Sequence, residues 1–524
     1  MVHFVVSSLV FDPTLGWQRG NYTLMVLAEA LRTGAGYRDL FLVGAPLHSA
    51  MPPAYPGLLA LLGIVGGVGL YKLVSLALTM GSVALAYALG CHYLPRRTAA
   101  LAAVIVGVSP ALLAASHSVL PAAQLLFLSM LTLWAAAEAS RAISASGGTA
   151  AVRRAWLEAL VIVSVVVAFL THTRAFPLLV ATPIYFLSRG RRKTALVAAV
   201  SGIMVAVAWT AFQLRAAPGS ESFLADLLFL GSELPGGGRV GAAEALTAAS
   251  RTAWARAGGV LGAYMGELPM LATSSPRYLP GSLLAASLAL VGWLRVNSGG
   301  KSGLADVFAL VYLFFAIIGP AEPSTAANLL PILPLVAIYS LVAASWLAAL
   351  PARRRGAPLK WPAMTAAIPA AVAIVFTVPA LVEVSRLAPD RVACLRAYAA
   401  GAPCEDESVS AFREVAELAR ERTPAEAIVI SRQPSMFYWF SGRRGAVYRR
   451  SSEPTLVLDA LDAVGASFLV IDRLDVTTTR YLAPVVRQSP ARFRWLLSEG
   501  QPPTLLLGIE PPDVMVLAAA LAGR

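Results

Sequence analysis

The feature that most constrains this chain is a series of long apolar segments whose short connections alternate in charge. Nearly every basic cluster falls on every second connection. These basic residues are Arg96, Arg97, Arg141, Arg153, Arg154, Arg189, Arg191, Arg192, Lys193, Arg295, Lys301, Arg353, Arg354, Arg355 and Lys360. The short connections on the opposite side carry a single basic residue, Arg174. Because cytoplasmic loops are enriched in lysine and arginine, the sequence predicts a multi-pass protein of the cytoplasmic membrane with its basic side inside.

The composition supports a membrane protein and argues against a nucleic-acid partner. Hydrophobic residues make up 57% of the chain and charged residues 14%, which does not suit a soluble globular protein. Residues 385–524 contain 17 basic and 16 acidic residues, so the excess positive charge belongs to the remainder. Membrane orientation and the anionic lipid headgroups explain that excess. We therefore expect membrane lipids, and no nucleic acid, among the partners.

The lengths of the apolar segments predict helices that cross the bilayer, since a crossing needs about 20 residues. The segments cover residues 70–94, 98–115, 119–140, 156–172, 175–188, 195–214, 279–295, 304–320, 328–349 and 361–384. The first apolar run, Val2–Phe11, is about half the required length. It is interpreted either as a helix clipped by a late start codon or as an interfacial segment. We favour the clipped helix, because the alternation needs a crossing there and then predicts about eleven crossings.

Two long loops and the tail are predicted to lie outside the cytoplasm. The first loop, residues 12–53, includes an amphipathic stretch at Tyr22–Arg32 that is typical of a helix on the membrane surface. The second loop covers residues 215–277. The predicted domains are therefore a transmembrane domain, residues 1–384, and an extracytoplasmic domain, residues 385–524.

The tail has the pattern of a small α/β domain. Helical spacing at Ser410–Arg422 is followed by a buried-strand run, Ala427–Ser431, and later segments alternate between strand and helix. This alternation predicts a partly parallel sheet. Cys394 and Cys404 lie in the connection before it, where a disulfide and two separate thiols are both open interpretations.

No motif of a soluble enzyme is present. The sequence lacks a Walker loop, HExxH, GxSxG and a cluster of metal ligands. His48, His117 and His172 fall at the predicted outer surface, but their loops show no ligand spacing. We predict no metal site from these residues, and no residue pattern supports a divalent cation.

Arg174 is the most specific of the polar residues predicted at the outer mouth of the bundle. Ionisable groups at membrane depth are costly and suggest a function by default. A guanidinium can grip a phosphate through two parallel hydrogen bonds. The other interpretation is an arginine that reaches lipid phosphates, or that pairs with Glu322 or Asp12. The sequence leaves both open.

Several short pieces of the sequence carry a family resemblance when taken in order. They are YTLMVLAEALRTGAGY at Tyr22–Tyr37, PPAYPGLLAL at Pro52–Leu61, LTHTR at Leu170–Arg174, NLLPILP at Asn328–Pro334, and AIVIS followed by SGR at Ala427–Ser431 and Ser441–Arg443. This order resembles the membrane glycosyltransferases of the GT-C fold. That group includes protein O-mannosyltransferases and the lipid A aminoarabinose transferase.

The resemblance implies a function and a set of site residues. Such enzymes move a sugar from a polyprenyl-phosphate donor onto a lipid, glycan or protein acceptor of the cell envelope. The residues expected to bind the donor phosphate are Arg174 and Arg19. The residues expected to line the cavity or contact the acceptor are His48, Tyr55, His117, Tyr22 and Glu322.

The first outer loop should supply a carboxylate that deprotonates or orients the acceptor hydroxyl. The acidic residue that the family carries just before its surface helix is missing from Trp17–Tyr22. Asp12 is the only acid earlier in this loop and is therefore the catalytic candidate. The alternative is a non-catalytic transporter, lipid-handling or envelope-assembly protein with a degenerate glycosyltransferase fold. The absence of a repeat between the two halves argues against a transporter.

Overall fold

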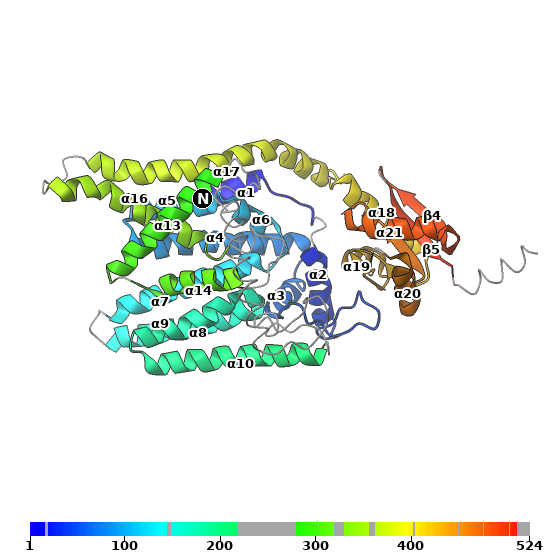
Figure 1. The fold of residues 1–524 in the computed structure, drawn as a ribbon, viewed down its shortest axis with the longest axis horizontal. Helices are drawn as coiled ribbons and strands as arrows, with labels where there is room; N and C mark the ends of the chain where they lie inside the picture. Colours follow the sequence, from blue (N-terminus) through cyan, green and yellow to red (C-terminus); the bar gives the residue numbers. More distant parts are fainter. Residues whose placement is uncertain are drawn as a thin grey trace, which may run out of the picture. The chain divides into compact units, whose positions relative to one another are not determined.

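The structure, a computed structural model, falls into two compact units that are described separately (Figure 1). It describes residues 1–15, 19–143, 148–216, 279–300, 302–318, 330–355, 362–401, 404–448, 451, 453–474, 476–501 and 503–510. The first unit comprises Met1–Phe11, Ser49–Tyr55 and Gly69–Val392. The second unit comprises Asp12–His48, Pro56–Val68 and Ala393–Arg524. The second predicted outer loop and Glu322 lie outside the described residues.

The first unit is built from helices, and each predicted crossing corresponds to one helix or helix pair. They are α1 (Val2–Leu9), α4 (Val68–Tyr93), α5 (Arg96–Gly107), α6 (Pro110–His117), α7 (Ala122–Ile143), α8 (Gly148–Thr171), η1 (Thr173–Ala175), α9 (Phe176–Ser188), α10 (Arg192–Ala216), α13 (Leu279–Ser298), α14 (Leu304–Ile318), α16 (Leu333–Arg355) and α17 (Pro362–Ala399). Figure 1 shows α7, α8, α9 and α10 running alongside one another. Within the described residues, six helices are long and apolar enough to cross a membrane. The prediction of a multi-pass helical membrane protein is confirmed, whereas the count of about eleven crossings stays a prediction.

Two local features explain how these helices bend and pack. The segment predicted at 98–115 is divided into α5 and α6, which meet at 59° beside Ser109 and Pro110. Proline lacks the N–H that a continuous helix needs, so the break falls there. Helices α13 and α16 approach closely at Gly292. A Cβ atom at that position would lie 1.9 Å from the Tyr339 carbonyl oxygen. Small residues allow such close helix contacts in membranes.

The bundle end that carries the basic connections is held together by buried carboxylates. The carboxylate of Asp306 accepts hydrogen bonds from the Tyr339 hydroxyl at 2.7 Å and the Gly303 amide at 2.5 Å. Glu158 accepts hydrogen bonds from Arg191 at 2.9 Å and Thr194 at 2.8 Å. Buried charges are stable only when such partners satisfy them. We interpret these groups as anchors of the helix ends.

The second unit contains a five-stranded sheet and the helices that cover it. Its helices are α2 (Arg19–Arg32), α18 (Glu407–Arg422), α19 (Pro434–Ser441), α20 (Pro454–Val464), α21 (Val476–Gln488) and η4 (Pro490–Arg492), while α3 (Ala54–Leu62) includes residues of both units. Its strands are β1 (Val429–Ile430), β2 (Gly445–Ala446), β3 (Phe468–Ile471), β4 (Phe493–Glu499) and β5 (Thr504–Ile509). The strand order is β2-β1-β3-β5-β4. Strands β2, β1 and β3 are parallel, and β5 is antiparallel to β3 and β4, so the sheet is partly parallel as predicted.

Alternate residues of the strands fill two separate cores. Val429, Val470 and Leu506 point to the side covered by α18 and α19. Ile430, Leu469 and Leu507 point to the side covered by α20 and α21. Successive side chains of a strand point to opposite faces, so a sheet with two covered faces needs apolar residues at every position. The unbroken apolar runs in β1, β3 and β5 follow from this arrangement.

The first outer loop joins this sheet instead of standing apart from it. Leu42 forms a parallel bridge with Gly445, and the Gly445 amide donates to the Phe41 carbonyl at 2.9 Å. A side chain at Gly445 would collide with the Val429 carbonyl oxygen, 1.9 Å from the site of its Cβ. The predicted domains placed this loop with residues 1–384, whereas its backbone hydrogen bonds group it with the tail.

Candidate functional site

The predicted site residues are divided between the two units. Tyr55, His117 and Arg174 belong to the first unit, while Asp12, Tyr22 and His48 belong to the second. Arg19 begins α2 in the second unit, but its side chain lies outside the described part of the chain. Each group is considered within its own unit.

Arg174 lies in η1, the short turn between α8 and α9. Its backbone amide donates to Nδ1 of His172 at 3.1 Å, so Nδ1 carries no proton. Burial, followed by the charge of Arg174, lowers the pKa of His172 to about 3. The imidazole is therefore neutral, and Arg174 supplies the positive charge of this turn. The turn lies at the helix ends away from the basic connections.

A chain of polar contacts links α1, α4 and α6 within the first unit. The Ser7 hydroxyl contacts the Ser116 hydroxyl at 2.9 Å and Nε2 of His117 at 2.7 Å. The ring of Phe11 meets the His117 ring edge-on, with 5.4 Å between centroids. Ser75 donates to the Ser118 carbonyl at 2.9 Å. These contacts gather at the start of α4 and the end of α6.

Lys72 is a charged residue at this place and is not among the site residues predicted from the sequence. It is 1% exposed, and its Nζ lies 5.7 Å from the centroid of the Phe11 ring. Lys72 and Ser75 are three residues apart on α4, so they share a face. The signal was present in the sequence as a lysine inside the apolar run 70–94. An intramembrane lysine is a functional candidate by default.

Tyr55 completes this group. Its hydroxyl is buried and, among the described residues, has no hydrogen bond of good geometry, although the Ser75 side chain is close enough to interact. The predicted residues Tyr55 and His117 therefore lie in one neighbourhood with Lys72. We call Phe11, Tyr55, Lys72, Ser75, Ser116 and His117 the α4 polar cluster. It lies at the end of α4 opposite Arg96.

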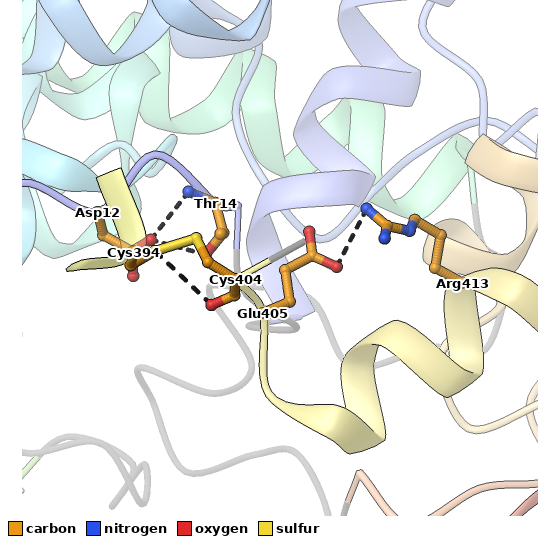
Figure 2. Close-up of a disulfide and its surroundings, with 6 residues drawn as sticks. All are labelled: Asp12, Thr14, Cys394, Cys404, Glu405 and Arg413. Carbon is orange, nitrogen blue, oxygen red and sulfur yellow. Dashed lines mark hydrogen bonds and ion pairs between the residues drawn. A yellow bond between two sulfur atoms is a disulfide. The ribbon is translucent and has the colours of Figure 1, made fainter. Parts of the chain in front are cut away.

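Asp12 lies in a turn at the start of the second unit. Its Oδ1 accepts hydrogen bonds from the Thr14 amide at 2.9 Å and the Thr14 hydroxyl at 2.7 Å. Figure 2 shows this turn together with the disulfide and the Glu405–Arg413 pair, whose charged atoms are 3.3 Å apart. Burial raises the pKa of Glu405, Arg413 opposes that rise, and the charge of Asp12 adds to it. The two carboxylates therefore interact electrostatically.

The disulfide joins Cys394 near the end of α17 to Cys404 before α18 (Figure 2). The sequence left open whether these cysteines pair. In the structure they form a bond that closes a short loop next to Glu405. Disulfides persist in oxidising compartments. A disulfide between Cys394 and Cys404 therefore agrees with the predicted position of this domain outside the cytoplasm.

His48 forms a buried pair with Asp39 in the second unit. Its Nδ1 lies 2.8 Å from Oδ1 of Asp39. The Tyr37 ring meets the His48 ring edge-on, with 5.4 Å between centroids. Asp39 is therefore the carboxylate partner of His48, nine residues before it in the chain. The sequence pattern did not predict this pairing.

Tyr22, one of the predicted cavity residues, lies in the core of the second unit. It is 3% exposed and belongs to the hydrophobic core that α18 and α19 form on the sheet. Its ring packs against Phe440, with 5.6 Å between centroids. The apolar face of α2 covers this core, which explains why the Tyr22 side chain points inward.

Among the residues that the structure describes, no group of three or more histidine, cysteine, aspartate or glutamate side chains could hold a metal ion. No protein-family model and no curated protein matches the sequence. The overall arrangement of the chain, in contrast, has clear counterparts among solved structures.

ArnT from Cupriavidus metallidurans in the apo state is 12% identical, with a TM-score of 0.57 over 97% of this chain and 97% of that one. The archaeal oligosaccharyltransferase AglB from Archaeoglobus fulgidus, in complex with an inhibitory peptide and a dolichol-phosphate, is 12% identical, with a TM-score of 0.57 over 98% of this chain and 74% of that one. The chain has the GT-C fold. The resemblance predicted from short motifs is confirmed at the level of the fold. A third structure with the GT-C fold is ArnT bound to undecaprenyl phosphate, with 12% identity and a TM-score of 0.53 over 97% of this chain and 96% of that one.

Proposed function

We propose that this GT-C protein transfers a sugar from a polyprenyl-phosphate donor to an acceptor at the outer face of the cytoplasmic membrane. The observation that carries the proposal is the buried ammonium of Lys72 within the α4 polar cluster. In surroundings of low dielectric, such a charge stabilises a nearby anion strongly. ArnT has been solved with undecaprenyl phosphate and AglB with dolichol-phosphate, which supports a lipid-linked phosphate as that anion.

Lys72 and Arg174 are the proposed donor-phosphate residues. Both lie at helix ends away from the basic connections. As the sugar leaves, negative charge grows on the phosphate, and fixed cations lower the energy of that transition state. Tyr55 and His117, which lie beside Lys72, are proposed to contact the donor. Arg19 and Glu322 keep the roles that the resemblance implies, as donor and cavity residues.

Asp12 is proposed to orient the acceptor hydroxyl or to take its proton. Its turn with Thr14 holds one oxygen of the carboxylate in place. A positioned carboxylate can align a hydroxyl for attack on the sugar. The acceptor class that the AglB structures suggest is a peptide, and lipid and glycan acceptors of the cell envelope are equally compatible with this chemistry.

The second candidate function is binding of a lipid-linked phosphate without transfer. The lack of an acid in Trp17–Tyr22 favours it, because the resemblance leads us to expect one there. Both candidates bind polyprenyl phosphate. Only the enzyme releases polyprenyl phosphate from a sugar-linked donor, so product release separates them.

The test of Asp12 uses the full chain in lipid nanodiscs with polyprenyl-phosphate sugars. We expect Asp12→Asn to lower the rate of polyprenyl-phosphate release about 10- to 100-fold, because a misaligned hydroxyl attacks slowly. Binding of undecaprenyl phosphate should not change. Glu426→Gln, which alters an exposed acid of the same unit, is the control. Equal rates for Asp12→Asn and the unaltered chain would remove this role.

A further inference from the structure

We propose that α10 binds the sugar of the lipid-linked donor through the indole N–H of Trp209 and the hydroxyl of Thr210. This inference rests on the proposed sugar transfer and names a further part of the donor site. Both residues belong to the first unit and lie toward the end of α10 that is away from the basic connections. Among the described residues, neither Nε1 of Trp209 nor Oγ1 of Thr210 has a hydrogen-bond partner, although both atoms are buried.

Other polar groups of the same kind in the first unit do have protein partners. The Thr182 hydroxyl donates to the carbonyl four residues before it at 2.7 Å, and the indole N–H of Trp293 donates to the Asp306 carbonyl at 3.1 Å. A buried donor that no group satisfies costs stability, because folding removes its bond to water without replacing it. Trp209 and Thr210 are adjacent and both carry this cost. A bound molecule is therefore the partner assigned to both.

The register of α9 and α10 places Trp209 at the level of the turn that contains Arg174. The two helices run alongside each other (Figure 1), and a Cβ atom at Gly202 would lie 3.3 Å from the Leu179 side chain. Trp209 is two turns beyond Gly202 on the same face, which is about 10.5 Å along the axis. Because the chain reverses between the helices, the same distance from Leu179 leads past Phe176 to η1. The polar atoms of α10 and the predicted phosphate residue therefore share one level of the bundle.

The faces of α10 show how a lipid-linked molecule reaches these atoms. Trp209 is 5% exposed, and Gln213, one turn further, donates to the Ser49 carbonyl at 2.9 Å. Val207, on the opposite face, is 61% exposed, as expected of a side chain in contact with lipid. Thr210 lies between the two faces and is half-buried. A donor whose polyprenyl chain lies in the lipid meets the polar atoms at this border.

The chemistry of the pair suits a sugar ring. An indole N–H donates, a hydroxyl both donates and accepts, and neither group is charged. Sugar hydroxyls bind to such neutral groups, whereas the phosphate of the same donor requires a cation. The Trp209 ring stacks on Phe212, with 5.4 Å between centroids and 22° between planes, and this contact orients the indole. Sugar recognition by α10 is thereby separate from phosphate binding by Arg174.

The test measures the affinity of the full chain in nanodiscs for undecaprenyl phosphate and for a panel of hexose- and pentose-linked undecaprenyl phosphates. The unaltered chain should bind at least one sugar-linked lipid more tightly than undecaprenyl phosphate. Thr210→Val keeps the side-chain shape and removes the hydroxyl, and Trp209→Phe keeps an aromatic ring and removes the N–H. Each variant should bind that sugar-linked lipid about 2- to 10-fold more weakly, the effect of losing one neutral hydrogen bond. Affinity for undecaprenyl phosphate itself should not change.

The unfolding midpoint separates sugar binding from a structural role. Replacing an unsatisfied buried hydroxyl by an apolar group removes a desolvation cost, so Thr210→Val should keep or raise the midpoint of the chain without lipid. The matched controls are Thr182→Val and Trp293→Phe, whose polar atoms have protein partners. Both should keep the preference for the sugar-linked lipid, and Trp293→Phe should lower the midpoint.

Three results would overturn the sugar subsite. They are a lack of any preference for a sugar-linked lipid in the unaltered chain, an unchanged affinity in Thr210→Val and Trp209→Phe, and an equal loss for lipids with and without the sugar. The last result would mean that the two side chains act on the phosphate or on the fold. If the chain bound sugar-linked lipids through these residues but released no polyprenyl phosphate, the proposed transfer would be wrong and the subsite would stand.

Discussion

Replacing Lys72 by methionine is expected to weaken binding of undecaprenyl phosphate about 10- to 100-fold. A hydrogen bond to a charged group contributes about 1.5–3 kcal/mol, which corresponds to that range. Methionine keeps most of the side-chain volume, so the α4 polar cluster should stay packed around Phe11. The measurement is a titration of the full chain in nanodiscs with undecaprenyl phosphate.

Two comparisons make the Lys72 result specific. Lys193→Met removes a lysine from the basic end of the bundle and should leave binding unchanged, because that residue is exposed at the opposite helix ends. Lys72→Arg keeps the charge and should retain more binding than Lys72→Met. If Lys72→Met bound the lipid normally but unfolded at a lower temperature, Lys72 would be a structural residue and the phosphate role would be wrong.

Gly292→Ala is expected to destabilise the first unit by about 3 kcal/mol or more. The added methyl group would lie 1.9 Å from the Tyr339 carbonyl oxygen, so α13 would have to move away from α16. Overpacking in a dense core costs about 1–3 kcal/mol, and a collision with backbone cannot be relieved by rotating a side chain. The same shift would disturb the hydrogen bond between Tyr339 and Asp306.

The measurement for Gly292 is the unfolding midpoint in detergent, followed by a denaturant titration. The control is Gly69→Ala in α4, where no atom lies within 4 Å of the added Cβ. Gly69→Ala should be neutral or slightly stabilising, because alanine favours helix more than glycine does. Equal midpoints for the two variants would show that α13 and α16 do not pack as closely as described.

The helices of the first unit could be predicted because apolar length alone places them. The sequence missed how far α17 continues. It reaches Ala399, although the apolar run ends near residue 384. Beyond that point charged residues interrupt the apolar run, and the helix continues through Pro389. Hydropathy therefore located the crossing but not the end of the helix.

In the second unit, α19 and α21 are two helices that the sequence pattern did not predict. Helix α19 begins with Pro434 and is closed by Gly442 in a left-handed conformation. Both are common helix-boundary residues. Its aromatic composition hid the helical pattern. Helix α21 contains Pro484, a residue that is disfavoured inside helices.

The candidate site was harder to predict, because its contacts are not local in the sequence. The bridge between Leu42 and Gly445 joins residues that no short-range pattern connects. Lys72 lies inside an apolar run, whereas the polar residues predicted from the sequence lie in or next to the loops. The Asp39–His48 pair depends on a turn-rich loop without helix or strand periodicity, so its pairing is visible only in the folded chain.

The most direct test of the account is release of polyprenyl phosphate by the purified full chain in nanodiscs. A panel of polyprenyl-phosphate sugars would be supplied with peptide, lipid and glycan acceptors, and products would be followed by mass spectrometry. We predict that at least one donor yields polyprenyl phosphate and glycosylated acceptor in equal amounts, and that Lys72→Met slows this release. Binding of the donors with no release from any of them would contradict sugar transfer and favour a binding-only role.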